Sequence, residues 1–284
     1  MSLPQYILTL SCPDQRGIVA SVSRFLLDND CNIIESAQFC DPVSQQFFMR
    51  TAFRSEGDRQ LPFLRTAFRR IEAEFGMAAS IYDCAIKPRT LILVSRMGHC
   101  LADLLYRNRI GAIGIEIPLV ISNHADLGDL VRAHGIRFRH TPVLDGDRKH
   151  REDQLLKLIE DEEIELIVLA RYMQILSPDV CAVMRGRIIN IHHSFLPSFR
   201  GARPYHQAHA RGVKLIGATA HYVTEELDEG PIIEQAVEPV THACAIDDLV
   251  ATGRDIESRV LARAVKWHAE HRILLDDNRT IVFT

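Results

Sequence analysis

The chain has 284 residues, of which 47% are hydrophobic and 25% are charged, a composition typical of a folded protein of about two domains. Its 33 basic and 37 acidic residues give a net charge of −4, which provides no electrostatic basis for binding nucleic acid or a membrane surface. No apolar run is long enough to span a membrane, and the N-terminus lacks the basic region of a signal peptide. The seven scattered cysteines form no C-x-x-C pair. We therefore expect a soluble, cytoplasmic protein with reduced thiols.

The first 86 residues predict a small domain with the element order β-α-β-β-α-β. Two segments have apolar residues at helical spacing, and four others have the composition of strands. This order is typical of a ferredoxin-like sandwich, in which two helices cover one face of an antiparallel sheet. The expected strands are 6–11, 32–40, 46–54 and 78–86, and the expected helices are 18–27 and 61–75.

A proline-containing stretch at residues 87–90 is interpreted as a linker to a second domain, residues 91–284. In this second domain short apolar runs alternate with helical segments, which predicts a doubly wound α/β fold with a mostly parallel sheet. None of the thirteen histidines precedes His99, so acid–base chemistry is expected here. The expected strands are 91–95, 115–122, 166–170, 188–192, 214–223 and 231–240, and the expected helices are 101–109, 127–134, 153–162, 178–184 and 246–271, followed by a hairpin around 276–279.

Two strands of the second domain carry polar side chains suited to catalysis. Asn190 and His192 alternate with isoleucines, so both point to one side at the C-terminal end of a strand, where α/β sheets bind ligands. Such a pair could polarise a carbonyl oxygen, or it could merely satisfy backbone groups. Thr219 and His221 share a face of a later strand, and Asp228 lies in a loop that could fold back over that face. Taken alone, this acidic loop is equally typical of a solvated surface.

Two further segments concern ligand binding. Residues 169–178 continue from a strand as an irregular apolar segment, which could form a wall for a flat aromatic ligand or simply be part of the core. The first strand–helix turn of the domain, residues 95–100, contains one glycine and matches neither a dinucleotide nor a triphosphate motif. No zincin or α/β-hydrolase motif occurs either.

Together these stretches resemble the folate-dependent formyltransferase family. The family's motifs L-A-x-x-M-x-I-L-S, N-I-H-x-S-x-L-P, H-x-V and L-D-x-G correspond to residues 169–177, 190–197, 221–223 and 227–230. The resemblance implies that Asn190, His192 and Asp228 are the catalytic residues, with His221 and Thr219 holding Asp228 or a water. It also implies that no metal, nucleotide or redox cofactor is needed. The residues expected to contact the pterin ring of the folate are Met173, Gln174, Ile175 and Leu176.

The N-terminal region, which contains S-C-P-D-Q-R-G-I-V, resembles an ACT domain. An ACT domain joined to a formyltransferase domain is similar to the formyltetrahydrofolate deformylase family, and this resemblance covers the whole chain. It implies hydrolysis of 10-formyltetrahydrofolate to formate and tetrahydrofolate, which supplies formate for purine biosynthesis. It further implies a homo-oligomer, dimer or tetramer, with a small amino acid as effector. We expect Asp14, Gly17 and Asn32 to meet at one end of the N-terminal sheet as the effector site.

Two departures distinguish the chain from amine-directed transformylases, which remain the alternative within the enzyme class. Transformylases hold the phosphate of their amine substrate with a glycine-rich loop, whereas residues 95–100 have lost those glycines. They usually have proline after the catalytic histidine, where this chain has His193. Without a site for glycinamide ribonucleotide, water becomes the expected acceptor. A non-catalytic amino-acid-binding regulator is the alternative outside the enzyme class.

Overall fold

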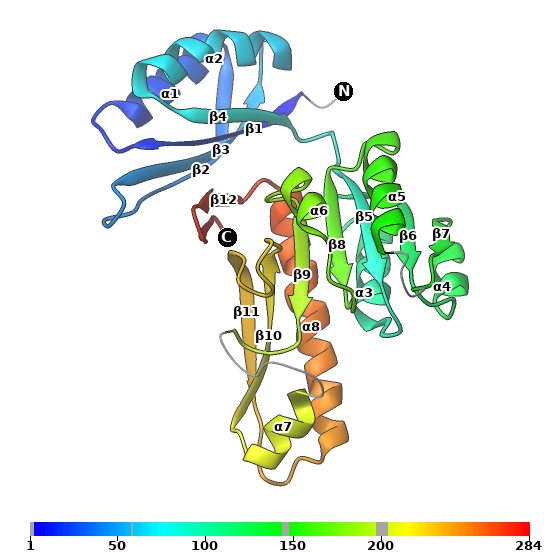
Figure 1. Cartoon of the computed structure of the whole chain (residues 1–284). Coiled ribbons are helices and arrows are strands. Elements are labelled where there is room, and N and C mark those ends of the chain that lie inside the picture. Colours follow the sequence, from blue (N-terminus) through cyan, green and yellow to red (C-terminus); the bar gives the residue numbers. More distant parts are fainter. Residues whose placement is uncertain (1–2, 58, 144–147, 197–203) are drawn as a thin grey trace. The chain divides into compact units, whose positions relative to one another are not determined.

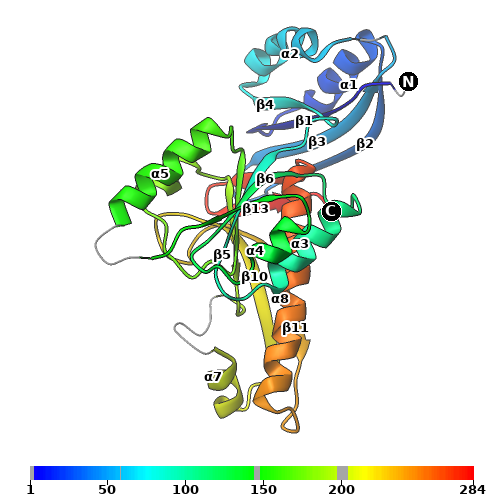
Figure 2. The same ribbon diagram turned by 90° about the vertical axis from the view of Figure 1, so that its right-hand side faces the viewer.

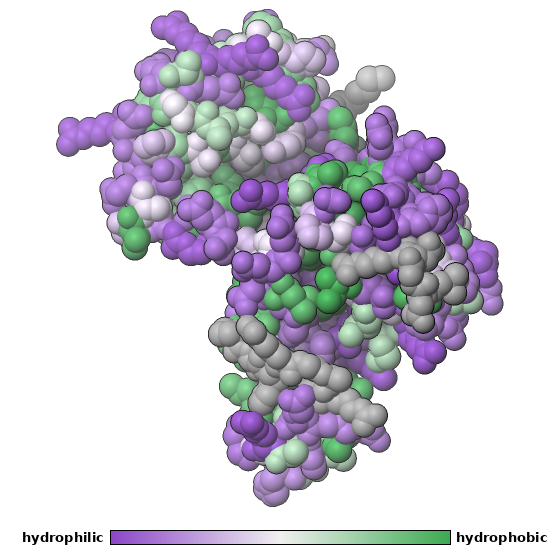
Figure 3. Space-filling view, viewed as in Figure 1, coloured by the Kyte–Doolittle hydropathy of each residue, from purple (hydrophilic) through white to green (hydrophobic). Residues whose placement is uncertain are grey.

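The computed structural model describes residues 3–57, 59–143, 148–196 and 204–284 and divides the chain into two compact units (Figure 1). The first unit comprises Met1–Lys87, Glu270–Asp276 and Ile281–Thr284, and the second comprises Pro88–Ala269 and Asp277–Thr280. Within the described residues, no helix has both the length and the apolar character needed to cross a membrane. Consistent with this, hydrophilic residues are spread over the face seen in Figure 3, with apolar residues among them.

The first unit has the ferredoxin-like fold that the sequence predicts. Its four strands form an antiparallel sheet in the order β2-β3-β1-β4, and both helices cover one face of it (Figure 1). The helices present Val22, Leu26, Leu64 and Phe68 to the sheet, where they form the core with strand residues such as Leu8. The elements are β1 (Gln5–Pro13), α1 (Ile18–Asp28), β2 (Cys31–Cys40), β3 (Gln46–Ser55), α2 (Leu61–Phe75) and β4 (Ala78–Asp83).

The C-terminal residues Glu270–Asp276 belong to this first unit, which differs from the assignment of residues 91–284 to a single second domain. The side chain of Arg50 is only 3% exposed, and its guanidinium donates to the Glu270 carbonyl from Nε at 3.2 Å and from Nη2 at 3.0 Å. Its Nη1 donates to Glu35 at 3.0 Å, and Arg272 also donates to the Glu35 carboxylate. A buried guanidinium requires acceptors, and here the returning chain end supplies them.

The expected effector residues do not meet in this unit, so that prediction is wrong. Asp14 and Gly17 follow the C-terminal end of β1, where Pro13 pairs with Gln46. Asn32 lies at the start of β2 and pairs with Arg54, the residue that also pairs with Gln5 at the opposite end of β1. The reason is topological. The helix that connects β1 to β2 returns the chain, so that both strands begin at the same end of the sheet.

The second unit is a seven-stranded sheet with the order β11-β10-β9-β8-β5-β6-β7. The five strands β9, β8, β5, β6 and β7 are parallel to one another. Strand β10 runs antiparallel to β9, and β11 runs antiparallel to β10. The strands are β5 (Arg89–Val94), β6 (Glu116–Ser122), β7 (Arg137–His140), β8 (Leu166–Ala170), β9 (Ile188–His192), β10 (Leu215–Tyr222) and β11 (Ile232–Pro239). The helices are α3 (His99–Arg109), α4 (Gly128–Arg132), α5 (Arg148–Asp161), α6 (Pro178–Val183), α7 (Pro204–Arg211) and α8 (Ile246–Ala269), and the chain ends in the hairpin β12 (Ile273–Asp276) and β13 (Arg279–Val282).

Helices cover both faces of this sheet, which confirms the doubly wound prediction (Figure 2). Leu158 and Ile159 of α5 and Val180 of α6 pack with alternate strand residues such as Leu91 and Ile167 on one face. Helices α3 and α8 lie on the other face (Figure 2). The central strands β5 and β8 are buried on both faces, and their continuous apolar sequences follow from that position.

Strand β7 is absent from the sequence prediction. It lies at the edge of the sheet and pairs only with β6 among the described strands. Three of its four residues are polar, and Phe138 is the one apolar side chain, so the segment has none of the apolar continuity by which the central strands are identified.

Candidate active site

The polar residues of β9 and β10 face one another across the junction of these strands. The antiparallel register pairs His192 with Thr219 and Asn190 with His221. Directly paired residues of antiparallel strands point to the same face of the sheet. As a result, Asn190 Nδ2 lies 3.2 Å from Nε2 of His221.

Asp228 joins this group from the loop between β10 and β11. Its carboxylate lies 3.3 Å from Nδ1 of His192 through Oδ2 and 3.6 Å from Nε2 of His221 through Oδ1. The loop doubles back because Asp228 adopts a left-handed backbone conformation with φ of 58°, which is unusual for a residue other than glycine. The structure therefore brings together the three residues proposed as catalytic, together with His221.

The two histidines control the charge of Asp228. The His192 hydrogen bond, then that of His221, holds the pKa of the Asp228 carboxyl well below its usual range, against the opposing effect of burial. Asp228 is therefore a carboxylate under ordinary conditions. Its negative charge lies against His192 Nδ1 and His221 Nε2.

The hydrogen-bond pattern of His221 defines the orientation of Asn190. His221 Nδ1 lies 2.9 Å from the carbonyl oxygen of Tyr222, so Nδ1 carries a proton and donates to that oxygen. The Asn190 amide nitrogen lies 3.2 Å from Nε2 of the same ring, the nitrogen that also faces Asp228. Asn190 retains a second N–H, which is the donor that a substrate oxygen requires.

Thr219 has a different role from the one expected. Rather than holding Asp228 or a water, its hydroxyl donates to the Ser194 carbonyl at 3.0 Å and accepts from the backbone N–H of Leu196 at 3.2 Å. Gln235 also donates to this hydroxyl at 3.0 Å. Thr219 therefore fixes the chain that follows β9. Pro197, the last residue of the N-I-H-x-S-x-L-P motif, lies outside the described residues.

A cavity of about 240 Å³ gives a ligand access to these groups. Its lining includes Asn190, His192 and Asp228 together with the whole Met173–Leu176 segment. His192 Nε2 is buried and has no hydrogen-bond partner in the part of the chain that the structure describes. This ring nitrogen is thus available to a bound substrate.

The apolar segment that follows β8 forms one wall of the cavity. Its side chains Met173 and Ile175 are 59% and 63% exposed, so the wall offers apolar surface to a ligand. Ser95 fixes the segment, since its hydroxyl accepts from the backbone N–H of Met173 at 3.0 Å and donates to Asn123 at 2.7 Å. A second cavity of about 340 Å³ shares Tyr172–Leu176 as lining, which extends the apolar surface toward α5.

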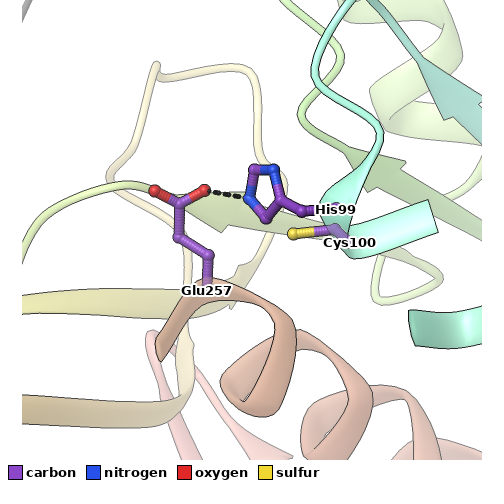
Figure 4. A group of neighbouring side chains, drawn as sticks. All are labelled: His99, Cys100 and Glu257. Carbon is purple, nitrogen blue, oxygen red and sulfur yellow. Dashed lines mark hydrogen bonds and ion pairs between the residues drawn. The ribbon is translucent and has the colours of Figure 1, made fainter. Parts of the chain in front are cut away.

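A buried polar cluster that the sequence analysis did not identify lies around Glu257 of α8. The Glu257 side chain is 2% exposed and accepts hydrogen bonds from His99 and Tyr205, each at 2.7 Å (Figure 4). Arg171 Nε lies 3.4 Å from the same carboxylate. Gly253 permits this arrangement, because a Cβ there would lie 2.0 Å from the Tyr205 hydroxyl oxygen. The available signal in the sequence was a carboxylate, Glu257, at a position on the buried face of an amphipathic helix.

The cluster also contains the one group of metal-ligand residues found among the described positions. Ligand atoms of His99, Cys100 and Glu257 lie within 4.8 Å of one another (Figure 4). Burial and the Glu257 charge raise the pKa of the Cys100 thiol well above its usual range, so this sulfur is protonated and a poor ligand. The Arg171 cation beside Glu257 further disfavours a second cation.

Residues 88–265 match the family described as Formyl transferase. The formyltetrahydrofolate deformylase of Corynebacterium sp. strain P-1 is 47% identical over 279 residues, which is 98% of both chains. The crystal structure of the deformylase from Burkholderia mallei has a TM-score of 0.94, at 49% identity and with 99% of this chain and 100% of that chain covered. Glycinamide ribonucleotide transformylase 1 from Symbiobacterium toebii has a TM-score of 0.67 at 31% identity, covering 72% of this chain and 97% of that one.

The position of Asp228 depends on Gly230, and we predict that Gly230→Ala destabilises the second unit. A Cβ at Gly230 would lie 1.8 Å from the carbonyl oxygen of Tyr222, so backbone must move. Overpacking of this kind costs about 1–3 kcal/mol. Thermal or urea unfolding measures the effect, and Gly114→Ala is the control, because no atom lies within 4 Å of a Cβ there. Equal stability of both variants would contradict the tight approach at Gly230.

Proposed function

This chain belongs to the formyltetrahydrofolate deformylase family and hydrolyses 10-formyltetrahydrofolate to formate and tetrahydrofolate, and we propose that Asn190, His192 and Asp228 carry out this reaction. The observation that supports the assignment is the contact of one ionised carboxylate with His192 and His221, beside the Asn190 amide and within a cavity that has an apolar wall.

In our proposal Asn190 and His192 stabilise the oxygen of the formyl group. The free Asn190 N–H and a proton on His192 Nε2 supply two donors to the oxyanion that forms when water attacks the formyl carbon. Asp228 orients the His192 ring through Nδ1, which leaves Nε2 to the formyl oxygen. Loss of one such donor typically lowers the rate by about 10²–10³.

We propose that Asp228 positions the attacking water and accepts its proton. The carboxylate is ionised before the reaction, so it can accept a hydrogen bond from water at once. The water proton becomes far more acidic as the oxygen adds to carbon, and transfer to a weak base is then favourable. Collapse of the tetrahedral intermediate breaks the bond from carbon to the folate nitrogen, which leaves protonated.

The pterin ring is proposed to lie against Met173, Gln174, Ile175 and Leu176. The exposed side chains of this segment offer apolar surface, and Ser95 holds its backbone in place. The side chains that act in this mechanism include a base, an acid and two oxyanion donors, so we propose that hydrolysis needs no metal or other cofactor. The seven free thiols support a cytoplasmic location, where cysteines remain reduced.

Transfer of the formyl group to an amine is the alternative that an assay must separate from hydrolysis. We expect formate release from 10-formyltetrahydrofolate to be unchanged by added glycinamide ribonucleotide, with no formylated amine formed. The reason is that the Ser95–Cys100 turn is engaged with the folate segment and with Glu257 through Ser95 and His99, rather than open to a phosphate. Formation of formylated amine at the rate of hydrolysis would favour the transferase.

Asp228→Asn tests the role of the carboxylate. We predict a fall in kcat of at least about 10², because the amide can neither accept the water proton nor stabilise a charged His192. The Kd for a non-reactive folate analogue changes little, since the proposed pterin wall is elsewhere. Asp129→Asn is the control, because the Asp129 side chain is 97% exposed and contacts only Arg132 among the ion pairs described. Near-normal turnover of the Asp228 variant would refute the assignment.

We propose that the first unit assembles the enzyme into a homo-oligomer and binds a small amino acid. Strand β2 is an edge of its sheet and exposes Ile33, Ile34 and Phe39, which is typical of a strand that pairs with another copy. The N-terminus of α1, preceded by Asp14 and by Gly17 with φ of 99°, offers backbone N–H groups to a carboxylate.

A ligand screen on the intact chain tests this proposal. We predict that at least one of the twenty amino acids, with glycine and methionine tried first, raises Tm and increases the oligomer mass measured by light scattering. The full chain is needed because the C-terminal residues complete the first unit. If no amino acid shifts either quantity, the first unit serves assembly alone.

A further inference from the structure

The guanidinium of Arg171 is largely buried, and one of its nitrogens lacks a hydrogen bond within the described part of the chain. Its side chain is 12% exposed, and Nε has no hydrogen-bond partner among the residues that the structure describes. The contact with Glu257 is an ion pair at 3.4 Å. An arginine side chain has five N–H donors, and buried donors are nearly always satisfied in native proteins. A planar anion would satisfy these donors.

The backbone conformation of Arg171 is energetically unfavourable for a residue other than glycine. Its φ is 63°, in the left-handed region that favours glycine. Residues in such conformations typically cost of order 1–3 kcal/mol and occur most often at functional sites. An arginine here therefore suggests that the side chain has a function that glycine could not supply.

Glu257 determines where the guanidinium lies. Hydrogen bonds from His99 and Tyr205 hold its two carboxylate oxygens, one each, and so oppose rotation of the carboxylate toward Arg171. Glu257 approaches Arg171 at Nε. The two terminal nitrogens of a guanidinium match the two oxygens of a carboxylate, and Arg171 lines the cavity in which formate forms.

Arg171 lines the same cavity as Asn190, His192 and Asp228. Hydrolysis converts the neutral formyl group in this cavity into formate, which carries a negative charge beside the Asp228 carboxylate. The neighbouring His193 provides no compensating charge, since burial and the Arg171 cation lower its pKa to about 4. Arg171 is thus the permanent cation in contact with the space where formate forms.

We propose that Arg171, held by Glu257, is a binding site for the carboxylate of the product formate. The inference rests on the hydrolysis assigned above. Water adds its oxygen to the formyl carbon, the bond from carbon to the folate nitrogen breaks, and one water proton goes to that nitrogen. The second proton is released as formic acid ionises, and the anion pairs with the guanidinium. Formate is in this way separated from Asp228, which must bind the next water.

Arg171→Gly is the variant best suited to a test, because glycine tolerates a φ of 63° and removes only the side chain. Sodium formate binding is measured by calorimetry on the intact enzyme with tetrahydrofolate present, and formate inhibition is measured in the hydrolysis assay. We expect the variant to bind formate at least about tenfold more weakly, as for loss of a charge-assisted hydrogen bond. Added guanidinium ion restores formate binding in the variant.

Three controls make the result specific to this site. Sodium acetate, which carries an additional methyl group, and sodium chloride compete less well than formate on the wild-type enzyme. Arg132→Gln, at a side chain that is 60% exposed, leaves formate binding unchanged. Glu257→Gln weakens formate binding less than Arg171→Gly does, because the guanidinium remains.

The outcomes separate this inference from the assigned reaction. Formate affinities within twofold for the wild type and Arg171→Gly, or no saturable formate binding by the wild type, would overturn the formate site while leaving hydrolysis intact. A variant that loses turnover but keeps its formate affinity would likewise overturn it. Formate binding through Arg171 without any hydrolysis of 10-formyltetrahydrofolate would instead refute the assigned reaction.

Discussion

The paired contacts of the Asp228 carboxylate with His192 and His221 set the geometry on which the catalytic unit depends. Each histidine comes from a different strand, and the carboxylate comes from the loop beyond them, so this charge connects three separate segments. The loop reaches its position through a left-handed residue and a glycine that lies against the Tyr222 carbonyl. The cost of that backbone conformation is offset by the interaction of one anion with two imidazoles.

A second residue of the catalytic cavity, Arg171, also has a left-handed backbone conformation. Arg171 and Asp228 both have positive φ, both line the catalytic cavity, and they carry opposite charges. Each is held by partners from other elements, Glu257 for the cation and the two histidines for the anion. The cavity therefore has charges whose positions are fixed before substrate binds, which is the condition for electrostatic preorganisation.

The sequence predicted the parts of this site that depend on strand periodicity and on recognisable motifs. Asn190 and His192 share a face because strand residues alternate, and the buried parallel strands were identified by their continuous apolar residues. The Glu257 cluster could not be predicted in the same way, because His99, Arg171 and Tyr205 are separated from Glu257 by between 52 and 158 positions and belong to no common motif. Asn32 was misplaced because the sequence indicated which segments are strands, but not at which end of the sheet each strand begins.

The return of the chain end to the first unit has a consequence for biosynthesis. Arg50 can donate to the Glu270 carbonyl only after the ribosome has added that residue. Arg272, which shares Glu35 with Arg50, is added two residues later. Synthesis of the intervening segment Pro88–Ala269 takes roughly 10–40 s at about 5–20 residues per second. During that interval the guanidinium of Arg50 has Glu35 as an acceptor but lacks the Glu270 carbonyl. The first unit is therefore completed only after the whole of Pro88–Ala269 has been synthesised.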